Sequence, residues 1–507
     1  MKRFAEILTF FELSNSPSIN GIEKDIVALT IDSRQITEGA AFIALSGVQS
    51  HGILYAEQAI KNGARCILTD TAGLAEFNKQ VDYHKMTTCP VIEVPLLDKR
   101  LADFAKWFYD APSERVKVIG VTGTNGKTSS SHYMAQMLNA LNYKIALMGT
   151  LGNGWFGALQ TSQNTTVDVV TLNHLLNDFA EQQADYVVME VSSHAIELGR
   201  IAGVRFEVLA MTQVTRDHLD FHHTEAAYQA TKKKLFLNYP SQYQVLNVDD
   251  LVGQTLLRAL STADRADRVV RYSQKNTQAD IVCLDSQLSL AGIQGTLIVQ
   301  GTSLAFALPL MGQFNLENVL CAVSVLSACG LEASQVQKSL ASVKAVSGRM
   351  ELLTQPDTPS ILIDYAHTPD ALEAVLKAAT HHASAQETKL WVVFGCGGDR
   401  DTGKRPLMGK VAEMYADEVV LTDDNPRSEL PEAIVADIKK GMHRPAKVIH
   451  DRPQAIAYAV KHASSSDMVV IAGKGHEDYQ EIKGKRWPMS DQKMVKELFS
   501  TTGAGSV

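Results

Sequence analysis

The stretch VKVIGVTGTNGKTSS, residues 116–130, decides the fold of this chain. Its first six residues are mostly β-branched and apolar, which is typical of a strand buried in a parallel sheet. Gly123 and Gly126 come next, and glycines let backbone N–H groups approach phosphate oxygens closely. Lys127 can neutralise phosphate charge, and the Thr128 hydroxyl can ligate Mg²⁺ at the start of the following helix. We therefore expect a nucleoside triphosphate to bind at this loop.

The loop departs from the general phosphate-loop pattern GxxxxGK[ST] at one position. That pattern places a glycine where this chain has Val121. The alternative is an ordinary glycine turn followed by a chance Lys-Thr pair, but the strand-like run before the turn argues against it. We therefore interpret the segment as a variant phosphate loop.

Length and composition are those of a globular enzyme with several domains. The chain has 507 residues, enough for about three domains. Its hydrophobic share of 45% and charged share of 21% are ordinary for such a protein. No apolar run approaches about 18 residues, so we expect no membrane insertion. The N-terminal segment MKRFAEILTFFELS is interrupted by Glu6 and Glu12, which predicts an amphipathic first helix and not a signal peptide.

Net charge and cysteine content indicate which kinds of ligand, cross-link and compartment suit the protein. The net charge of −8 argues against general binding to nucleic acid, so an acidic substrate must be held by local basic groups. The six cysteines show no CxxC spacing, which indicates neither a disulfide framework nor a zinc site. This cysteine usage fits a reducing compartment. We expect a cytoplasmic protein, and a monomer.

The order of short apolar runs and helix-length segments predicts an α/β fold. Runs such as DYVVMEVSSH and DEVVLTDDNPR end in polar residues, and helix-length segments at residues 370–382 and 432–441 lie between such runs. Alternating strands and helices form mostly parallel sheets, whose ligands collect beyond the carboxyl ends of the strands. By contrast, residues 270–310 alternate like antiparallel strands. Domain joints are expected near Pro112 and Ser347.

These patterns predict three domains. Residues 1–108 form a small mixed α/β domain, and residues 109–346 a central domain with a mostly parallel sheet like that of phosphate-loop ATPases. Residues 347–507 form a Rossmann-like α/β domain. These boundaries rest on composition and pattern.

Three further polar residues stand out in the middle of the chain. Glu190 closes an apolar run, and a carboxylate there could hold Mg²⁺ together with Thr128. His218 lies in TRDHLDFHH, but histidine is an unusual Mg²⁺ ligand, so a structural hydrogen bond is the alternative. Lys232 lies in YQATKKKLF, where three consecutive lysines could simply form a solvated helix face. The residues alone leave the roles of His218 and Lys232 undecided.

The chain resembles the Mur ligase family, the ATP-dependent amide-forming enzymes of peptidoglycan synthesis. The form TGTNGKT of the phosphate loop is one matching segment. The others follow in family order and cover nearly the whole chain: DSRQITEGAAFIALSG, NTTV, EVSSHAIELGR, TRDHLDFHH, YQATKKKLF, LMGQFNLENVLCA, VSGRME, IDYAHTPDALE, FGCGGDRDTGKRP, TDDNPR and AGKGHEDYQ. The resemblance implies a ligase that adds meso-diaminopimelate to UDP-N-acetylmuramoyl-L-alanyl-D-glutamate through an acyl phosphate. The implied domain roles are UDP-substrate binding, ATP binding and amino-acid binding, in chain order.

The resemblance also implies which residues bind ATP and metal. The implied ATP-binding residues are Gly123, Thr124, Asn125, Gly126, Lys127, Thr128, Asn315, Asn318, Arg349, Asp364 and His367. The implied Mg²⁺ ligands are Thr128, Glu190, His218 and Lys232, the last after carbamylation by CO₂, which turns the lysine into a carboxylate. Lys127, Lys232, His218 and Glu190 are the implied catalytic residues. Lys232 is chosen among its neighbours because the family spacing Tyr-x-x-x-Lys is met by Tyr228.

The two other substrates have their own implied contacts. Those to the UDP-muramoyl dipeptide are Ser33, Asn164, Thr165, Thr166, Ser192 and Arg200, whose donors suit uridine and pyrophosphate. Leu198, where related enzymes carry Gln, and Val48-Gln49, where His-Gln is common, depart from the family pattern. The implied contacts to diaminopimelate are Arg400, Asp424, Asn425, Pro426, Arg427, Gly473 and Glu477.

The choice of acceptor rests on the segment Asp-Asn-Pro-Arg. Diaminopimelate has a distal carboxylate that the Arg427 guanidinium can grip with two hydrogen bonds, whereas lysine offers only a cation there. Glu477 would pair with the distal ammonium. The same ligase with L-lysine as acceptor stays the alternative.

Three other protein classes share part of this pattern. Folylpolyglutamate synthase has a similar loop and chemistry, but the DSR-containing first domain and the DNPR segment argue against it. A phosphate-loop kinase would stop at phosphoryl transfer and release no phosphate in response to an amine. A non-catalytic sensor is disfavoured by the presence of Glu190, His218 and Lys232.

Overall fold

The computed structural model of the chain describes residues 1–13, 25–47, 50–79, 89–162, 164–263, 265–289, 291–383 and 388–503. The chain divides into two compact units that alternate along the sequence. Unit 1 comprises Met1–Thr122, Tyr143–Leu209 and Ala226–Gln244. Unit 2 comprises Gly123–Asn142, Ala210–Glu225 and Val245–Val507. Among the described residues, no helix combines the length and apolar character that crossing a membrane requires.

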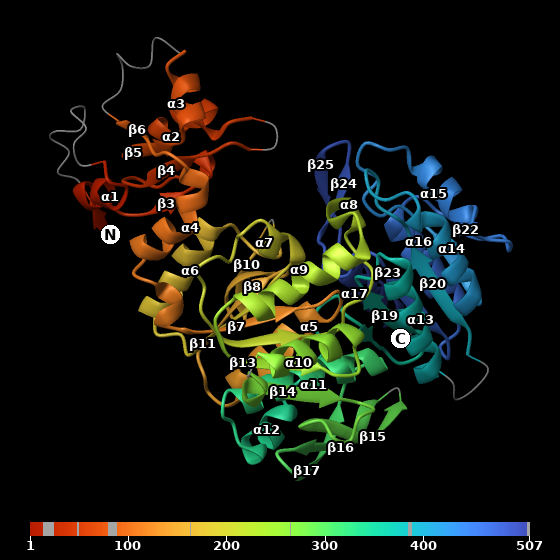
Figure 1. Ribbon diagram of the computed structural model, residues 1–507. Helices are drawn as coiled ribbons and strands as arrows, with labels where there is room; N and C mark the ends of the chain where they lie inside the picture. The colour runs from red at the N-terminus through yellow and green to blue at the C-terminus, as the bar shows by residue number, and fades with distance from the viewer. Residues whose placement is uncertain are drawn as a thin grey trace. The chain divides into compact units, whose positions relative to one another are not determined.

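The N-terminal part of unit 1 is a small sheet with helices on both faces, drawn in red and orange in Figure 1. The sheet consists of four parallel strands, β3 (Leu29–Thr30), β4 (Ala41–Ala44), β5 (Cys66–Thr69) and β6 (Val91–Glu93). One face packs on α1 (Phe4–Phe10) and α4 (Leu97–Phe108), and the other on α2 (Ala56–Lys61) and α3 (Thr71–Phe77). Two short strands, β1 (Lys2–Arg3) and β2 (Asp25–Ile26), pair antiparallel. The predicted first helix is confirmed as α1.

The second part of unit 1 holds the strand that leads to the phosphate loop. Three parallel strands, β8 (Ile145–Gly149), β11 (Tyr186–Glu190) and β7 (Lys117–Thr122), lie in that order. At the edge, β9 (Gly152–Trp155) and β10 (Ala158–Gln160) pair antiparallel. The helices are α6 (Val169–Glu181) and α7 (Ser193–Glu197). The unit boundary crosses β12 (Phe206–Met211), α9 (Glu225–Asn238) and β13 (Ser241–Asn247).

Unit 2 begins with the helix that follows the phosphate loop, α5 (Lys127–Ala140). Its further helices are α8 (Leu219–His222), α10 (Leu251–Thr262), α11 (Gln313–Ala328) and α12 (Ala333–Leu340). Strand β14 (Val269–Ser273) pairs parallel with β15 (Ile281–Ser289). From β15 the sheet continues antiparallel to β16 (Gly292–Val299) and β17 (Thr302–Leu308), which confirms the alternation predicted for residues 270–310.

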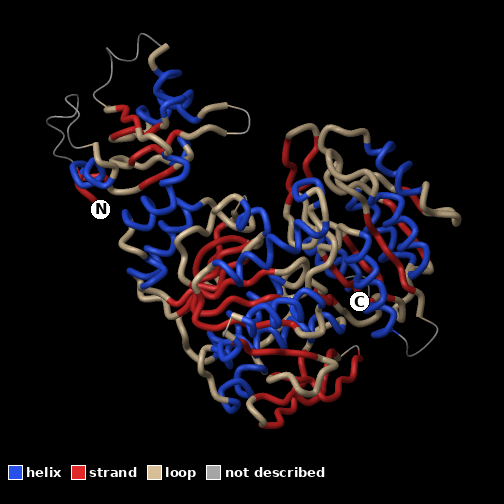
Figure 2. Tube along the Cα trace, in the orientation of Figure 1, coloured by secondary structure: helices blue, strands red, loops and turns tan. Residues whose placement is uncertain are grey.

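The C-terminal part of unit 2 is a Rossmann-like domain, as predicted. Its strand order is β18 (Glu351–Leu353), β19 (Ser360–Asp364), β23 (Met468–Ala472), β20 (Leu390–Phe394), β21 (Glu418–Leu421) and β22 (Lys447–Val448), parallel except for β18. One face packs on α13 (Pro369–Ala383), α14 (Lys404–Tyr415) and α15 (Pro431–Lys439), and the other on α16 (Arg452–His462) and α17 (Asp491–Gly503). Figure 2 shows the red strands of this sheet among its blue helices. The hairpin of β24 (Tyr479–Ile482) and β25 (Lys485–Pro488) follows β23. The helices predicted at residues 370–382 and 432–441 are confirmed as α13 and α15.

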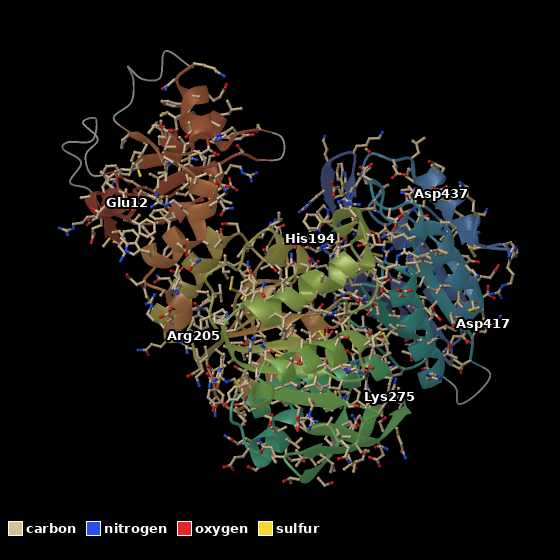
Figure 3. All side chains as sticks on the ribbon, in the orientation of Figure 1. Glu12, His194, Arg205, Lys275, Asp417 and Asp437 are labelled. Atoms are coloured by element: carbon tan, nitrogen blue, oxygen red, sulfur yellow. The ribbon has the colours of Figure 1, made fainter. Side chains whose placement is uncertain are left out.

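A buried arginine joins the loops at the carboxyl ends of β20 and β21. The Arg405 side chain is 1% exposed and ion-pairs with Glu429 at 2.8 Å and with Asp437, which Figure 3 labels, at 3.0 Å. Its Nη2 also donates to the Gly397 carbonyl at 3.2 Å. Because the guanidinium contacts both loops and α15, it fixes the backbone on which Arg400 and Arg427 are carried.

A second buried ion pair lies beside β23. Arg452 and Asp491 are both fully buried, and two hydrogen bonds of 2.8 Å join the guanidinium to the carboxylate. Arg452 also donates to the Ala472 carbonyl at 3.0 Å. The pair thus connects α16, α17 and the end of β23.

We expect Asp491→Asn to destabilise the C-terminal domain by about 3 kcal/mol, because it leaves a buried guanidinium without its counter-charge. Urea unfolding followed by circular dichroism measures this. The control is Glu418→Gln in the exposed Lys389–Glu418 pair, expected to change stability by less than about 1 kcal/mol. Equal urea midpoints for Asp491→Asn and the wild type would contradict the importance of the buried pair.

Candidate functional site

The phosphate loop connects the end of β7 to the start of α5 and requires glycine at two positions. Gly126 has φ +87°, and a Cβ there would come within 2.2 Å of Asn318 Oδ1. A Cβ on Gly123 would come within 1.8 Å of Thr212 Oγ1. The backbone N–H groups that open α5 have no intrahelical acceptor, so this end of the helix suits an anion. The loop therefore has the backbone geometry that its sequence predicts.

A second segment, directly after β12, holds the loop in place. The Thr124 N–H donates to the Gln213 carbonyl at 2.7 Å, and the Thr212 hydroxyl donates to the Asn125 carbonyl at 2.6 Å. The Thr215 N–H donates to Thr124 Oγ1 at 2.9 Å. Sequence reasoning missed these threonines. Their only signal is their place just beyond the end of an apolar run.

The two predicted phosphate-side residues open α5. The Lys127 ammonium donates to the carbonyls of Gly123 and Thr124, both at 2.9 Å, so it curls back over the loop. Thr128 is 5% exposed and occupies the first turn of the helix. The charge of Lys127 thus lies at the loop that we expect to receive the phosphates.

The predicted adenine-side asparagines brace α11 against α5. Asn315 Oδ1 accepts from the Tyr133 hydroxyl at 3.0 Å, and Asn315 Nδ2 donates to the Met311 carbonyl at 2.8 Å. Asn318 Nδ2 donates to Asn315 Oδ1 at 3.0 Å, and Asn318 Oδ1 accepts from the Ser130 hydroxyl at 3.4 Å. Asn315 is only 1% exposed. Its contact with adenine stays a prediction.

Asp364 and Arg349 lie together at the edge of the C-terminal domain. The Asp364 carboxylate accepts from the N–H groups of Met350 and Ala366, both at 2.8 Å. Burial raises the pKa of Asp364, although the nearby Arg349 guanidinium opposes that shift. The Arg349 guanidinium carbon lies 4.5 Å from the centre of the Tyr365 ring. These contacts fix a carboxylate and a guanidinium side by side.

The same cluster includes histidines. His367 Nδ1 lies 2.8 Å from the Tyr365 carbonyl, so this nitrogen carries the proton and donates. His132 on α5 has its pKa lowered to about 4 by burial and by the Arg349 charge. Among the described residues, Arg349 Nε is buried without a hydrogen-bond partner. An unpaired buried donor next to the phosphate-loop helix suits a ligand oxygen.

Glu190 ends β11 in unit 1, where a hydroxyl and a backbone amide hold its carboxylate. It is 2% exposed and pairs in register with Val121 of β7, two residues before the phosphate loop begins. Oε1 accepts from the Thr150 N–H at 2.9 Å, and Oε2 accepts from the Thr150 hydroxyl at 3.1 Å. A Cβ on Gly149 would come within 2.3 Å of Oε1. Thr150 was not predicted, although it follows the strand-like run YKIALMG.

Of the three consecutive lysines, one is buried. Lys232 is 1% exposed, with Nζ 3.4 Å from Thr122 Oγ1 and 4.8 Å from the centre of the Tyr228 ring. Lys234 lies at the surface and ion-pairs with Glu197 at 2.8 Å. The interpretation as a solvated face is therefore wrong for Lys232 and correct for Lys234. Thr122 immediately precedes the phosphate loop, so Lys232 contacts its base.

The predicted metal ligands belong to both units. Glu190 and Lys232 are in unit 1, and Thr128 and His218 are in unit 2. The His218 side chain is 44% exposed, and its Nε2 lies 3.4 Å from Asp217 Oδ2. Within the described part of the chain, no group of three or more His, Cys, Asp or Glu side chains is placed to hold a metal. A hydroxyl and a carboxylate are donors that Mg²⁺ prefers, but Lys232 could join them only as a carbamate.

Four of the residues predicted to contact the UDP-muramoyl dipeptide, the donor substrate, lie close to Glu190. Thr166 Oγ1 donates to the Glu190 carbonyl at 2.8 Å and accepts from the Ser192 N–H at 3.1 Å. Arg200 donates to the Thr166 carbonyl at 3.0 Å. The hydroxyls of Thr165 and Thr150 are 3.1 Å apart. The structure thus connects the donor-side residues to the predicted metal ligand.

The other predicted donor-side positions lie apart from this group. Ser33 is buried and donates to Gln58 Oε1 at 2.8 Å in the N-terminal part of unit 1. Asn164 is exposed, and its carbonyl accepts from the Ser162 hydroxyl at 2.9 Å. Leu198, which departs from the family pattern, is 55% exposed after α7. Val48 and Gln49 lie outside the described residues.

The predicted acceptor residues come together from three adjacent strand ends. They follow β20, β21 and β23 at their carboxyl ends, where ligands bind in such sheets. Arg427 donates to the Gly398 carbonyl at 2.7 Å, and its Nε lies 3.4 Å from Glu481 Oε2. A Cβ on Gly397 would lie 2.9 Å from Arg427 Nη1 and 3.6 Å from Arg400 Cγ, so both arginines border this glycine.

Of the remaining acceptor-side residues, Glu477 is partly exposed and the others are buried. Asn425 Nδ2 donates to Glu477 Oε2 at 2.9 Å. A Cβ on Gly473 would come within 2.4 Å of Asp424 Oδ2, so this close approach requires glycine. Pro426 is buried and links Asn425 to Arg427. Two guanidinium groups and two carboxylates therefore border one small region, which suits a ligand that carries both charges.

Known proteins match this chain along almost its full length. Three family models match: the Mur ligase family, catalytic domain at residues 25–109, the Mur ligase middle domain at residues 121–326, and the Mur ligase, glutamate ligase domain at residues 348–475. They follow one another in chain order. The predicted α/β fold with three domains is thereby confirmed.

Two relatives and one solved structure carry the same enzyme name. A UDP-N-acetylmuramoyl-L-alanyl-D-glutamate–2,6-diaminopimelate ligase from Pseudomonas putida is 41% identical over 469 residues, 91% of this chain and 92% of that protein. The same-named ligase from Haemophilus ducreyi is 41% identical over 485 residues, 93% of this chain and 95% of the relative. A solved structure of a ligase of that name superposes with a TM-score of 0.66 and 34% identity, covering 99% of this chain and 100% of the other. The chain belongs to the Mur ligase family.

Proposed function

We propose that this protein joins meso-diaminopimelate to UDP-N-acetylmuramoyl-L-alanyl-D-glutamate, with ATP converted to ADP and phosphate. The gathering of Arg400, Asn425, Arg427 and Glu477 at one sheet edge carries the proposal. It supports an acceptor with a carboxylate and an ammonium beside its reacting amine. Relatives that are 41% identical over nine tenths of the chain bear the name of this reaction.

The nucleotide is held by residues of unit 2. The loop Gly123–Thr128 supplies backbone N–H groups to the phosphates, and Lys127 offsets their charge. Asn315 and Asn318 lie on the adenine side. Arg349, Asp364 and His367 contact ribose and phosphates. The unpaired Arg349 Nε supports this role, because a ligand oxygen would satisfy it.

The UDP-substrate is held by Ser33, Asn164, Thr165, Thr166, Ser192 and Arg200. Hydrogen bonds from Thr166 to the Glu190 carbonyl and from Arg200 to Thr166 support a common role for this group. The donor carboxylate would then lie near the end of β11, beside the strand that leads into the phosphate loop.

Thr128, Glu190, His218 and carbamylated Lys232 would hold Mg²⁺. When bound, Mg²⁺ offsets the repulsion between the donor carboxylate and the ATP phosphates and stabilises charge on the transferred phosphoryl group. Thr150 orients the Glu190 carboxylate through two hydrogen bonds. The burial of Lys232 supports the carbamate, because its amine is enclosed beside Thr122 and Tyr228 and not spread into solvent.

The reaction has two steps. An oxygen of the donor carboxylate attacks the γ-phosphorus of ATP, so the bond to the β-phosphate oxygen breaks and an acyl phosphate and ADP form. The amine of diaminopimelate then attacks the acyl carbon, loses a proton, and expels phosphate from the tetrahedral intermediate. Lys127 neutralises charge at the phosphoryl group in the first step. Exclusion of water protects the acyl phosphate from hydrolysis.

The proposal is tested by comparing two amino acids as the acceptor. Purified protein is given ATP, UDP-N-acetylmuramoyl-L-alanyl-D-glutamate and either meso-diaminopimelate or L-lysine, and phosphate release is measured together with product mass. We expect release with diaminopimelate only, because Arg427 and Arg400 pair with the distal carboxylate that lysine lacks. Equal release with lysine would overturn the acceptor assignment but keep the ligase, and no release with either would contradict the ligase itself.

The same proposal includes the roles of the three domains, the oligomeric state and the cellular process. We place UDP-substrate binding in residues 1–108, ATP binding in residues 109–346 and amino-acid binding in residues 347–507. The protein acts as a monomer on cytoplasmic peptidoglycan precursors, a process tied to cell shape and division. Size-exclusion chromatography with light scattering checks the monomer.

A further inference from the structure

A fully buried lysine lies behind the predicted acceptor site. The Lys474 side chain is 0% exposed, although lysine is among the residues least often buried. Its ammonium donates to Glu477 Oε2 at 2.8 Å and to Asn425 Oδ1 at 3.2 Å. It also lies 5.3 Å from the centre of the Tyr479 ring. Lys474 therefore contacts two of the predicted diaminopimelate-binding residues at once.

The ammonium determines which way the Asn425 amide faces. Asn425 Oδ1 accepts from Lys474 Nζ and from the Glu481 N–H at 2.8 Å. If the amide were flipped by 180°, its NH₂ group would face the Lys474 ammonium and the Glu481 N–H. Both of these groups are donors and cannot accept a hydrogen bond from the NH₂ group. The Asn425 NH₂ group must therefore face Glu477, and it donates to Glu477 Oε2 at 2.9 Å.

Both donors meet the same oxygen of Glu477. Oε2 accepts from Lys474 and Asn425, whereas no hydrogen bond to Oε1 occurs among the described residues. Burial acts to raise the pKa of Glu477, but the Lys474 ammonium and these hydrogen bonds outweigh it, so the pKa is lowered. Glu477 is thus held as a carboxylate with one oxygen left for a ligand.

We propose that Lys474 is a positioning residue of the acceptor site. It holds Asn425 and Glu477 Oε2 so that Glu477 Oε1 receives the distal ammonium of the acceptor. Lys474 itself does not touch the acceptor. The inference rests on the proposed function, since it assumes that diaminopimelate binds at these strand ends.

The test compares Lys474→Met with the wild type in the phosphate-release assay. Lys474→Met keeps the length of the side chain but removes its charge and its hydrogen bonds. We expect the KM for meso-diaminopimelate to rise at least about tenfold, as for loss of a hydrogen bond to a charged group. The KM values for ATP and the UDP-substrate stay within about twofold, because Lys474 contacts no residue assigned to them. Lys474→Arg restores part of the affinity, and the exposed Lys461→Met serves as the matched control.

A second acceptor separates positioning from a general effect on the fold. 2-Aminopimelate keeps the reacting amine and both carboxylates but lacks the distal ammonium. We expect the wild type and Lys474→Met to show KM values for it within about twofold of each other, because the contact that Lys474 supports is then absent.

Each other outcome has a definite meaning. An unchanged KM for diaminopimelate in Lys474→Met, or equal losses with both acceptors, would overturn the positioning role. Failure of the wild type with diaminopimelate would instead overturn the proposed function. If Lys474→Met does not fold, as judged by thermal melting, Lys474→Gln carries the same expectations.

Discussion

Lys127→Ala is expected to lower the kcat of acceptor-dependent phosphate release by at least about a hundredfold. The substitution removes a preorganised positive charge that would stabilise the phosphoryl group during its transfer. In the structure the ammonium lies over the phosphate loop, 2.9 Å from the carbonyls of Gly123 and Thr124. Alanine leaves the backbone of the loop intact but cannot neutralise the phosphates. Steady-state kinetics with saturating ATP, UDP-substrate and diaminopimelate measure the loss.

A matched lysine distinguishes this effect from a change of net charge. Lys338 lies exposed on α12 in the same unit, and Lys338→Ala is expected to leave kcat within about twofold of the wild type. Near-normal turnover of Lys127→Ala would show that the phosphate loop is wrongly assigned.

Lys232→Ala is expected to lower kcat by at least about a hundredfold as well, and added short carboxylates are expected to restore part of the loss. The side chain is buried beside Thr122 and Tyr228, so alanine opens a space at the base of the phosphate loop. Formate or acetate can enter that space and supply the carboxylate that a carbamate would provide. Titration of each carboxylate into the variant measures the rescue.

The neighbouring lysine supplies the control for this second experiment. Lys234 lies two residues further along α9, at the surface, where it pairs with Glu197. Lys234→Ala is expected to keep kcat within about twofold of the wild type and to show no response to formate or acetate. If no carboxylate restores Lys232→Ala, the carbamate must be given up, although a structural role of the amine would survive.

Several parts of the fold could be predicted because they depend on neighbouring residues. The strand, the two glycines and the helix of the phosphate loop lie within residues 116–130, and their backbone preferences are local. The antiparallel strands β15, β16 and β17 follow from alternating polar and apolar residues. Helices α13 and α15 were predicted as helix-length segments between strand-like runs.

The environment of the three lysines could not be predicted in this way. Lys232, Lys233 and Lys234 are adjacent on a helix, so their side chains point in directions about 100° apart. Which direction faces the interior depends on how α9 packs. The structure buries Lys232 and leaves Lys234 exposed, and composition contains no signal for that difference.

Residues that position the site were missed for a related reason. Thr150 holds Glu190 from 40 residues away in the chain, and Thr212 contacts the phosphate loop from 87 residues away. A threonine at the end of a strand looks the same in sequence whether it binds a catalytic carboxylate or water. Such pairs arise only when separate strands align in one sheet.

The sequence by itself determined the phosphate loop, the alternation of strands and helices, and membership of the Mur ligase family, because each depends on local backbone preferences or on motifs in order along the chain. Only the tertiary structure decided that Lys232 is buried, that Thr150 orients Glu190, and that Lys474 joins Asn425 to Glu477. Burial and hydrogen bonding between distant residues are products of packing. They are therefore set by the distances that folding creates and not by spacing in the chain.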